Sequence, residues 1–401
     1  MWNQLRGINM FNKNIDEITQ KDLEDLIENG VMEGKTIEYK RELNCSKDSD
    51  KKEFLADVSS FANAAGGYLI FGIEEDRETG LPKSLCGLEI DNIDEEIRKI
   101  ESVIRGGISP KLPKLETKYI ELDNNNIVLI IKVGRSWLSP HRIVFKGCDK
   151  FFSRNTNSKY SLDVEELRTA FNLSSTITDK IRLFVQERIS KLNINETPIP
   201  YKSDVKLIMH LIPFESFANN NLLHVKDFKN EVMKLRPIYS NGWNHKINFD
   251  GHLLYDSDDN RLSSSFVQCY RNGIVEYVNS SMFPSPEPMY KIIPSVLYEQ
   301  ELIETLDSTL KYFKSINIEC PIFLFLSFVN IRDYEMAVDK RFWFGHKKYT
   351  MDRDILITPE LIINDYNVDT KIILRPVFDS IWNACGLSES LNYDENNNFK
   401  Y

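Results

Sequence analysis

Closely spaced cysteine and histidine pairs are missing from this sequence of 401 residues. The six cysteines are scattered along the chain, so neither a disulfide framework nor a zinc knuckle is indicated. The six histidines form no His-x-x-x-His or Glu-x-x-His pair, which argues against a histidine-based metal site. We therefore interpret the cysteines as reduced, mostly structural thiols.

Long apolar runs are missing as well. The longest ones, such as Ile127 to Ile131 and Pro321 to Val329, are far too short to cross a bilayer. Residues 1–10 lack the basic-then-apolar pattern of a signal peptide. The sequence therefore predicts a cytoplasmic protein that has no membrane partner.

An excess of positive charge is the third missing feature, because the formal net charge is -10 at pH 7. This balance argues against a protein that coats nucleic acid with its whole surface, since such binding requires neutralisation of many phosphates. A local site is still allowed. Between Lys132 and Arg168, basic residues outnumber acidic ones, although an ordinary solvated face would have the same composition. The basic residues are Lys132, Arg135, Arg142, Lys146, Lys150, Arg154, Lys159 and Arg168.

The composition that is present, 42% hydrophobic and 27% charged, is typical of a folded protein, and the length allows two domains. Apolar periodicity predicts a strand at 36–43, a helix at 51–65 and a buried strand at 68–73. Further strands follow, and then a helix at 162–173. After a connecting helix and a Pro-rich linker, strands and helices alternate again.

These patterns predict an α/β (α+β) fold with two domains. The first domain has a mixed sheet, and the second is an α+β domain of unknown function. The predicted divisions are an N-terminal extension at 1–15, the first domain at 16–175, a helix and linker at 176–204, the C-terminal domain at 205–391 and a disordered tail at 392–401.

The segment from Glu33 to Glu42 carries the first candidate site. Glu33 and Glu38 lie five positions apart, and Lys40 follows two residues later. Carboxylates that hold Mg²⁺ or Mn²⁺, next to a positive group that contacts a phosphate, would suit hydrolysis of a phosphodiester. Such triplets also arise by chance in a chain rich in lysine and glutamate, so a plain surface strand is the alternative.

The second segment runs from Phe61 to Asp76. Gly66 and Gly67 are explained by the end of the predicted helix, which needs a residue in the left-handed conformation. Three acids at 74–76 then follow a buried strand, a position where site residues are often presented. No Gly-Lys-Ser/Thr follows the glycines, so the pattern is not a P-loop, and an ATP-dependent function is the weakest interpretation.

Together, the two segments resemble the Schlafen AlbA-like domain over roughly residues 20 to 175. The resemblance rests on order and spacing, and two later segments look like the closing part of the same domain. The motifs are Glu33-x4-Glu38-Tyr39-Lys40, Phe61-Ala62-Asn63 with Gly66-Gly67, Phe71-Gly72-Ile73, Ser139-Pro140-His141 and Phe151-Phe152-Ser153-Arg154.

The resemblance implies nucleic-acid binding and, in the Schlafen branch, a divalent-metal-dependent endoribonuclease that acts on tRNA or rRNA. Three acids form that site, and Glu33, Glu38 and Glu75 fit them, as catalytic residues and as ligands of Mg²⁺ or Mn²⁺. The family usually has Asp at the third position, so Glu74 and Asp76 are alternative ligands. Lys40 would contact a phosphate or the transition state. The residues expected to bind nucleic acid are Lys40, Arg41, His141, Arg142, Lys146 and Arg154.

The alternative function is a DNA- or RNA-binding regulator or sensor without catalysis, and either function would suit bacterial antiphage defence. The Schlafen core places two lobes opposite one another, whereas this chain has one recognisable lobe. Either two chains pair as a homodimer, which we favour, or the C-terminal domain supplies the other wall. The aromatic residues of the second domain, such as Trp243, Phe249 and Phe266, are expected to fill a core. The basic segment at 339–348 is a candidate secondary contact.

Overall fold

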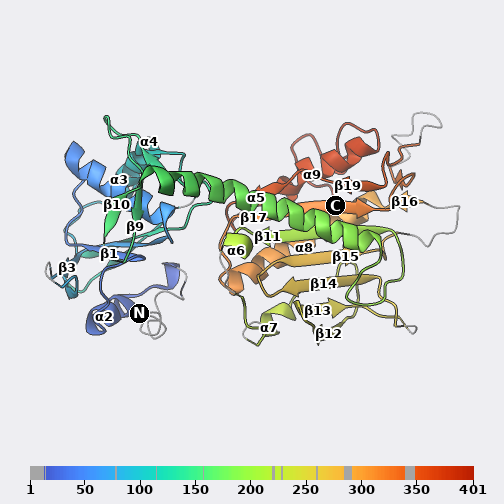
Figure 1. The fold of residues 1–401 in the computed structure, drawn as a ribbon, viewed down its shortest axis with the longest axis horizontal. Coiled ribbons are helices and arrows are strands. Elements are labelled where there is room, and N and C mark those ends of the chain that lie inside the picture. The colour runs from blue at the N-terminus through green and yellow to red at the C-terminus, as the bar shows by residue number, and fades with distance from the viewer. Residues whose placement is uncertain are drawn as a thin grey trace. The chain divides into compact units, whose positions relative to one another are not determined.

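The computed structural model describes residues 13, 15–76, 79–113, 115–156, 158–218, 222–226, 229–258, 261–283, 291–338 and 348–401. The chain divides into two compact units, Met1–Thr176 and Ile177–Tyr401 (Figure 1). Helices and mixed or antiparallel sheets occur in both units, which confirms the α/β (α+β) fold. Among the described residues, no helix is long and apolar enough to cross a membrane.

The N-terminal unit is built on a four-stranded sheet with the order β1-β2-β7-β6, in which only β1 and β2 are parallel. Its helices are α2 (Gln20–Glu28), α3 (Asp48–Asn63) and α4 (Ile93–Gly107), preceded by the short helix η2 (Ile15–Glu17). Its strands are β1 (Ile37–Lys40), β2 (Gly67–Phe71), β3 (Ile73–Glu75), β4 (Pro82–Leu85), β5 (Ile108–Ser109), β6 (Leu115–Glu121), β7 (Ile127–Val133), β8 (Arg142–Ile143), β9 (Phe152–Arg154) and β10 (Lys159–Ser161).

Both faces of this sheet are covered, and the central strands are therefore apolar on both sides. On one face, Leu129 and Ile131 of β7 pack with residues of α3 and α4, including Phe61 and Ile104. On the other face, alternate residues of the same strands pack with α2, for example Ile130 with Leu26. This packing fixes the position of β1 and β2, from which the candidate site extends.

The turn between α3 and β2 explains the paired glycines. Gly66 has a φ of +73°, the left-handed conformation expected at the end of a helix. A Cβ atom on Gly67 would lie 2.5 Å from the Phe61 ring and 2.5 Å from the carbonyl oxygen of Thr36. The backbone oxygen cannot move aside cheaply, so Gly67 is required for close packing of the helix against the sheet.

Gly67→Ala is therefore expected to lower the free energy of unfolding of the N-terminal unit by about 1–3 kcal/mol. Urea denaturation followed by circular dichroism would measure the change. Gly106→Ala in α4 is the matched control, because no atom lies within 4 Å of a Cβ at that position. That control should be neutral or stabilising, since alanine has the higher helix propensity. Equal losses in the two variants would contradict the packing argument.

The C-terminal unit is built on an eight-stranded sheet with the order β12-β13-β14-β15-β11-β17-β19, and β20 also pairs with β17. Its helices are α6 (Glu215–Ala218), α7 (Lys229–Val232), α8 (Ser295–Ser315) and α9 (Thr370–Ala384). Its strands are β11 (Lys206–Pro213), β12 (Asn244–Ile247), β13 (Gly251–Tyr255), β14 (Ser265–Tyr270), β15 (Val275–Asn279), β16 (Ile292–Ile293), β17 (Ile322–Val329), β18 (Glu335–Met336), β19 (Ile355–Ile357) and β20 (Leu361–Ile363).

One face of this sheet packs with α8 and α9 in a large apolar core, in which Phe378 and Trp382 of α9 are fully buried. The other face is contacted by the second half of α5 (Val164–Asn193), where the Phe184 ring lies edge-on against His210 and Tyr270. The sheet is thus a central layer with helices on both sides.

Helix α5 is continuous across residues 174–176, whereas the sequence analysis expected separate helices before and after this segment. No glycine or proline lies there to end a helix, which accounts for the difference. The tail at 392–401, predicted to be disordered, is instead folded: Asn392, Tyr393 and Phe399 are buried, and the rings of Tyr393 and Phe399 lie 5.3 Å apart. Composition alone had indicated disorder, but the two aromatic side chains provide apolar contacts.

The aromatic side chains of the C-terminal unit differ in their burial. Phe266 is fully buried and Trp243 packs against the core, as expected. Phe249 departs from this expectation, because 93% of its surface is exposed. The basic segment at 339–348 lies outside the described residues except for Lys348, which pairs with Glu335 over 3.7 Å.

Candidate functional site

Glu33 lies just before β1 and is held by the strand that follows it. Its Oε1 accepts a hydrogen bond of 2.6 Å from the backbone N–H of Tyr39, and its own N–H donates to the carbonyl oxygen of Gly80 over 3.1 Å. Gly80 belongs to the turn between β3 and β4. These bonds bring the segment before β1 next to the β3–β4 hairpin, although the two are far apart in sequence.

Glu75 ends β3 in this hairpin and forms a side-chain hydrogen bond with the Glu33 carboxyl. Burial raises the pKa of Glu33, and the negative charges of Glu38 and Glu75 raise it further, to about 8. At neutral pH, the Glu33 carboxyl group is therefore protonated in most molecules. The structure therefore brings together the three acids that the sequence analysis selected.

Glu38 has different neighbours, because two cations contact its carboxylate. Lys40 Nζ lies 2.7 Å from Oε1, and Arg154 Nη2 donates to Oε2. Burial by itself would raise the pKa of Glu38, but Arg154 and Lys40 hold it below its ordinary value. Glu38 is thus a buried, ionised carboxylate that holds two positive side chains in place.

Asp57 completes this arrangement and was missed by the sequence analysis. It lies on α3 with 2% of its surface exposed, and Lys159 Nζ lies 2.8 Å from its Oδ1. Arg154 and Lys40 lie 3.7 and 3.8 Å from its carboxylate oxygens. Asp57 has one sequence signal: it falls three residues after Phe54 and four before Phe61, on the apolar face of the helix.

We call Glu38, Asp57, Lys40, Arg154 and Lys159 the ion-pair cluster. The cations of β1, β9 and β10 meet the acids of β1 and α3 there. The guanidinium of Arg154 also stacks over the Phe61 ring, 4.2 Å from its centre. Breaking such a buried network by removing one partner leaves uncompensated charge, which is strongly destabilising. The cluster therefore connects the C-terminal part of the domain to β1 and α3.

The motif residue Asn63 has a structural role in the same region. Its amide donates to the carbonyl oxygens of His141 and Phe152 over 2.9 and 2.8 Å, and it accepts from the His141 N–H over 2.6 Å. Asn63 thereby clamps the two closing segments of the domain against the end of α3. Through these hydrogen bonds, the separate motifs form one packed part of the domain.

Two of the predicted nucleic-acid contacts need correction. The ring of His141 is fully buried, its Nδ1 lies 2.7 Å from the carbonyl oxygen of Pro110, and burial lowers its pKa. Arg154 is buried in the ion-pair cluster. Neither side chain can reach a phosphate without leaving these partners. The sequence pattern could not show this, because arginine is mostly exposed and histidine is intermediate in burial, so residue type does not predict these buried positions.

Three other predicted contacts are exposed. Arg41, Arg142 and Lys146 extend from the N-terminal unit into solvent, each beside an acidic residue. Such surface pairs are weak, so phosphates can replace the carboxylates. Lys40 is intermediate, with one third of its side chain exposed (33%).

The alternative ligands Glu74 and Asp76 point to other partners. Glu74 pairs with Arg41 over 3.2 Å, and Asp76 pairs with Lys83 over 3.0 Å. For a metal, carboxylate oxygens are the right donor chemistry, and the proton held by Glu33 beside Glu75 occupies a position that a cation could take. Across the described part of the chain, however, no group of three or more His, Cys, Asp or Glu residues is placed to hold a metal ion.

The N-terminal unit is thus an α/β domain with adjoining acidic and basic side chains at the edge of a mixed sheet. Residues 33–163 match the family model described as Schlafen, AlbA_2. This match confirms the resemblance, and the N-terminal part of the chain carries this family's domain. On this basis, we assign a nucleic-acid-related function to the N-terminal unit.

Two solved structures are similar over the same share of the chain. One is the N-terminal domain of a protein from Nitrosomonas europaea described as related to the ATP-dependent DNA helicase RecG. It is 23% identical, with 35% of this chain and 92% of that chain covered and a TM-score of 0.26. The other is the DIP2311 protein from Corynebacterium diphtheriae, 20% identical, with 35% and 26% covered and a TM-score of 0.24. None of the curated proteins compared with the sequence matches it.

Proposed function

We propose that the N-terminal unit binds nucleic acid and cleaves structured RNA, such as tRNA or rRNA, with the help of Mg²⁺ or Mn²⁺. The observation that carries this proposal is the pair of carboxyl groups, Glu33 and Glu75, beside the ionised Glu38 and its partner Lys40. Acidic oxygens and a neighbouring ammonium group are what phosphodiester hydrolysis requires.

Glu33 and Glu75 are the residues that would hold the cation. Mg²⁺ is commonly bound by one or two carboxylates together with substrate phosphates, so a third protein ligand is not needed. The cation would supply charge that offsets the negative oxygens of the reacting phosphate. Glu33 would have to give up its proton to hold the cation, since only an ionised carboxylate binds a metal.

Lys40 is the protein group that would contact the reacting phosphate. Glu38 fixes the position of its ammonium group, and burial would lower the pKa of Lys40, but Asp57 and Glu38 raise it above its ordinary value. Lys40 therefore stays charged at all physiological pH values. Arg41, Arg142 and Lys146 would bind the phosphates on either side of the cleaved bond.

Purified protein incubated with total tRNA tests the proposal. Fragments are expected with Mn²⁺ and not with EDTA, and Glu33→Gln or Glu75→Gln should reduce the rate by about 100-fold. Glu74→Gln is the matched control, because this neighbouring acid pairs with Arg41 and lies outside the carboxyl pair. It should cleave at the wild-type rate. Intact tRNA at high enzyme and Mn²⁺ concentrations, or equal losses in all three variants, would contradict the proposal.

The second candidate function is a nucleic-acid-binding regulator or sensor that does not cleave. The observation that favours it is the pairing of Glu38 with Arg154 and Lys40, which keeps this acid away from a metal. This function predicts retention of uncut tRNA or single-stranded DNA, and binding that weakens steeply with salt. Affinity that is unchanged between low and high salt would count against it.

The proposal also covers the oligomeric state and the biological role of the protein. A homodimer would supply a second copy of the lobe, and a role in antiphage defence would suit an RNA-cleaving protein. Analytical ultracentrifugation of the whole chain, with and without tRNA, tests the first point. A monomer under both conditions would contradict it.

A further inference from the structure

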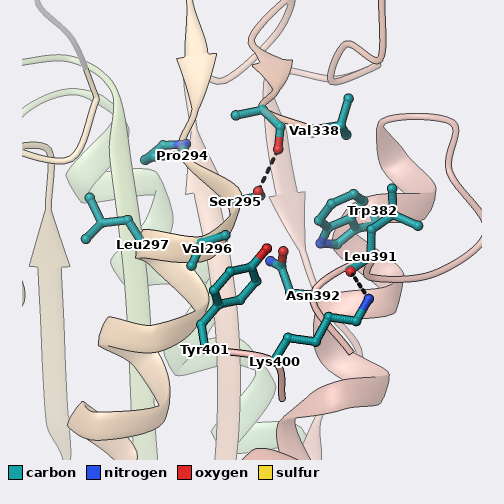
Figure 2. Close-up of a pocket in the computed structure, with 11 residues that line it drawn as sticks. Pro294, Ser295, Val296, Leu297, Val338, Trp382, Leu391, Asn392, Lys400 and Tyr401 are labelled. Atoms are coloured by element: carbon teal, nitrogen blue, oxygen red, sulfur yellow. Dashed lines mark hydrogen bonds between the residues drawn. The ribbon is translucent and has the colours of Figure 1, made fainter. Parts of the chain in front are cut away.

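A pocket of about 660 Å³ lies in the C-terminal unit, and several polar side chains in its wall already have partners (Figure 2). Ser295 and Lys400 donate to backbone carbonyl oxygens over 2.6 and 2.8 Å. The Asn392 amide hydrogen-bonds the buried Glu299 carboxyl group. These contacts hold the wall of the pocket together and indicate no ligand.

Strand β6 forms one edge of the sheet in the N-terminal unit. The order β1-β2-β7-β6 places β7 on one side of it and, among the described residues, no strand on the other. Along its whole length, Leu115–Glu121, β6 pairs antiparallel with β7. The outer side of such an edge presents backbone N–H and C=O groups that can hydrogen-bond a strand of another chain.

Alternate residues of β6 direct their backbone groups towards this open edge. Ile127 of β7 exchanges two hydrogen bonds with Leu88, over 3.0 and 2.7 Å, and so directs its N–H and C=O groups away from Glu121, its neighbour in β6. Hydrogen-bonded and non-hydrogen-bonded pairs alternate along an antiparallel ladder. The odd-numbered residues of β6, from 115 to 121, therefore present their N–H and C=O groups to the outside.

The side chains of β6 are complementary to a second copy of the same strand in one register. In a symmetric antiparallel pair, the outward N–H and C=O groups meet only if odd-numbered positions lie opposite odd-numbered ones. With Thr117 opposite the partner's Thr117, Glu116 lies opposite the partner's Lys118. Leu115 then lies opposite the partner's Tyr119. Opposite charges and apolar side chains directly across from one another stabilise paired strands.

The neighbouring registers are less favourable. A pair centred on Lys118 places two lysines directly opposite each other, and a pair centred on Glu116 does the same with two glutamates, which is destabilising. A pair centred on Tyr119 places Lys118 opposite Ile120, so its charge is not matched. Charge complementarity therefore selects the register centred on Thr117.

The charges of Lys118 and Glu116 allow this pairing. The ammonium group of Lys118 donates to the backbone carbonyl oxygens of Asp16 and Ile18, and no carboxylate in the described part of the chain forms an ion pair with it. The partner's Glu116 would supply that negative charge. Glu116 itself lies 3.8 Å from Lys132 of β7, and the partner's Lys118 would add a second cation beside its carboxylate.

We propose that two copies of the chain pair through β6, antiparallel and centred on Thr117, so that the two N-terminal sheets join into one continuous sheet. Each pair of outward-facing residues exchanges two backbone hydrogen bonds. The ring of Tyr119, which is 39% exposed, packs against the partner's Leu115. This inference rests on the homodimer proposed above, for which it names the contact surface, and it does not depend on RNA cleavage.

Oxidative cross-linking of the whole chain tests the register. The Cα atoms of a hydrogen-bonded antiparallel pair lie about 5.5 Å apart, which suits a disulfide. Thr117→Cys should therefore give a dimer that reducing agent dissociates. Glu121→Cys is the matched control, because it lies on the same open edge but its two copies would be about 27 Å apart in this register. It should cross-link no more than the wild-type chain, whose own cysteines set the background.

Sedimentation equilibrium of charge variants tests the ion pairs. Glu116→Lys and Lys118→Glu should each weaken the dimer about tenfold, because each turns two attractive pairs into two repulsive ones. An equimolar mixture of the two variants should dimerise as well as the wild type, since one then presents only positive and the other only negative charge at these positions. Glu121→Lys, outside the complementary residues, should dimerise like the wild type. Circular dichroism confirms that each variant is folded.

The outcomes separate this inference from the proposals on which it builds. A wild-type chain that stays monomeric at every concentration would overturn both the β6 contact and the homodimer. A dimer that persists in both charge variants, or Thr117→Cys that cross-links no more than Glu121→Cys, would overturn the β6 contact alone. Cleavage of tRNA is measured separately and is affected by neither result.

Discussion

Arg154→Met is expected to lower the free energy of unfolding of the N-terminal unit by about 3–5 kcal/mol. Arg154 donates to Glu38 and lies 3.7 Å from Asp57, and both carboxyl groups are buried. Methionine retains much of the apolar contact with the Phe61 ring but provides no charge. The variant therefore isolates the cost of leaving two buried acids with fewer cations.

Urea denaturation, followed by a signal from the N-terminal unit, would measure this loss. Lys146→Met is the control, because its pair with Asp48 is exposed on both sides. That substitution should cost less than about 1 kcal/mol. Arg154→Lys should recover part of the stability, since it restores one charge without the two-pronged geometry. A loss for Arg154→Met no larger than that of Lys146→Met would show that the ion-pair cluster contributes little.

Local patterns predicted the parts of the fold that depend on neighbouring residues. The order of strand, helix, glycine pair and strand at 36–73 matches β1, α3 and β2, because apolar periodicity and the left-handed turn at Gly66 are encoded locally. Spacing within one segment suggested that Glu33 and Glu38 act together. The approach of Glu75 to Glu33 came only from the family resemblance, since it depends on the position of the β3–β4 hairpin.

The sequence patterns could not predict which side chains contact one another in the tertiary structure. The resemblance implied that Arg154 and His141 contact nucleic acid, yet Glu38 and Pro110 hold them inside. Asp57 was not selected at all, because a single acid in a helix usually faces solvent. The one indication of burial is the position of Asp57 on the apolar side of its helix. This position can be interpreted only once its cationic partners are known.

The structure shows how positive and negative side chains are paired in the N-terminal unit. Within the N-terminal unit, the cations closest to the candidate site are neutralised by buried acids, and the exposed ones lie beside surface carboxylates. Nucleic-acid binding would therefore replace weak protein ion pairs with phosphate contacts, which makes the affinity depend on salt. Arg41→Ala and Arg142→Ala probe this exchange without disturbing the buried cluster.

Arg188→Met should give the second large effect, a loss of about 3–5 kcal/mol in the free energy of unfolding of the C-terminal unit at pH 7. Arg188 of α5 donates to both carboxylate oxygens of Glu276, over 2.9 and 2.8 Å. Glu276 is fully buried in β15, and His210 Nε2 lies 2.8 Å from its Oε2. Removing Arg188 leaves the carboxylate buried without its two-pronged partner.

The pH dependence of this loss is a sharper test than its size. Burial would raise the pKa of Glu276, but Arg188 and His210 lower it from 4.5 to about 2. A folded-state pKa below the unfolded value gives stabilisation that is complete above about pH 4.5 and is lost as the pH falls towards 2. In Arg188→Met, uncompensated burial should raise the pKa of Glu276 instead, so protonation in acid relieves the unpaired charge. The difference between the two proteins should therefore be largest at pH 7 and should shrink below about pH 4.

Lys191→Met provides the control on the same helix, because Lys191 forms an exposed pair with Glu187 over 2.8 Å. It should leave the stability nearly unchanged at every pH. Thermal unfolding of the three proteins at pH 7 and at pH 3.5 makes the comparison. If the deficit of Arg188→Met persisted unchanged in acid, its cause would be lost packing of the arginine stem and not the charge of Glu276. A deficit that shrinks in acid would instead establish that a buried ion pair holds α5 on the sheet.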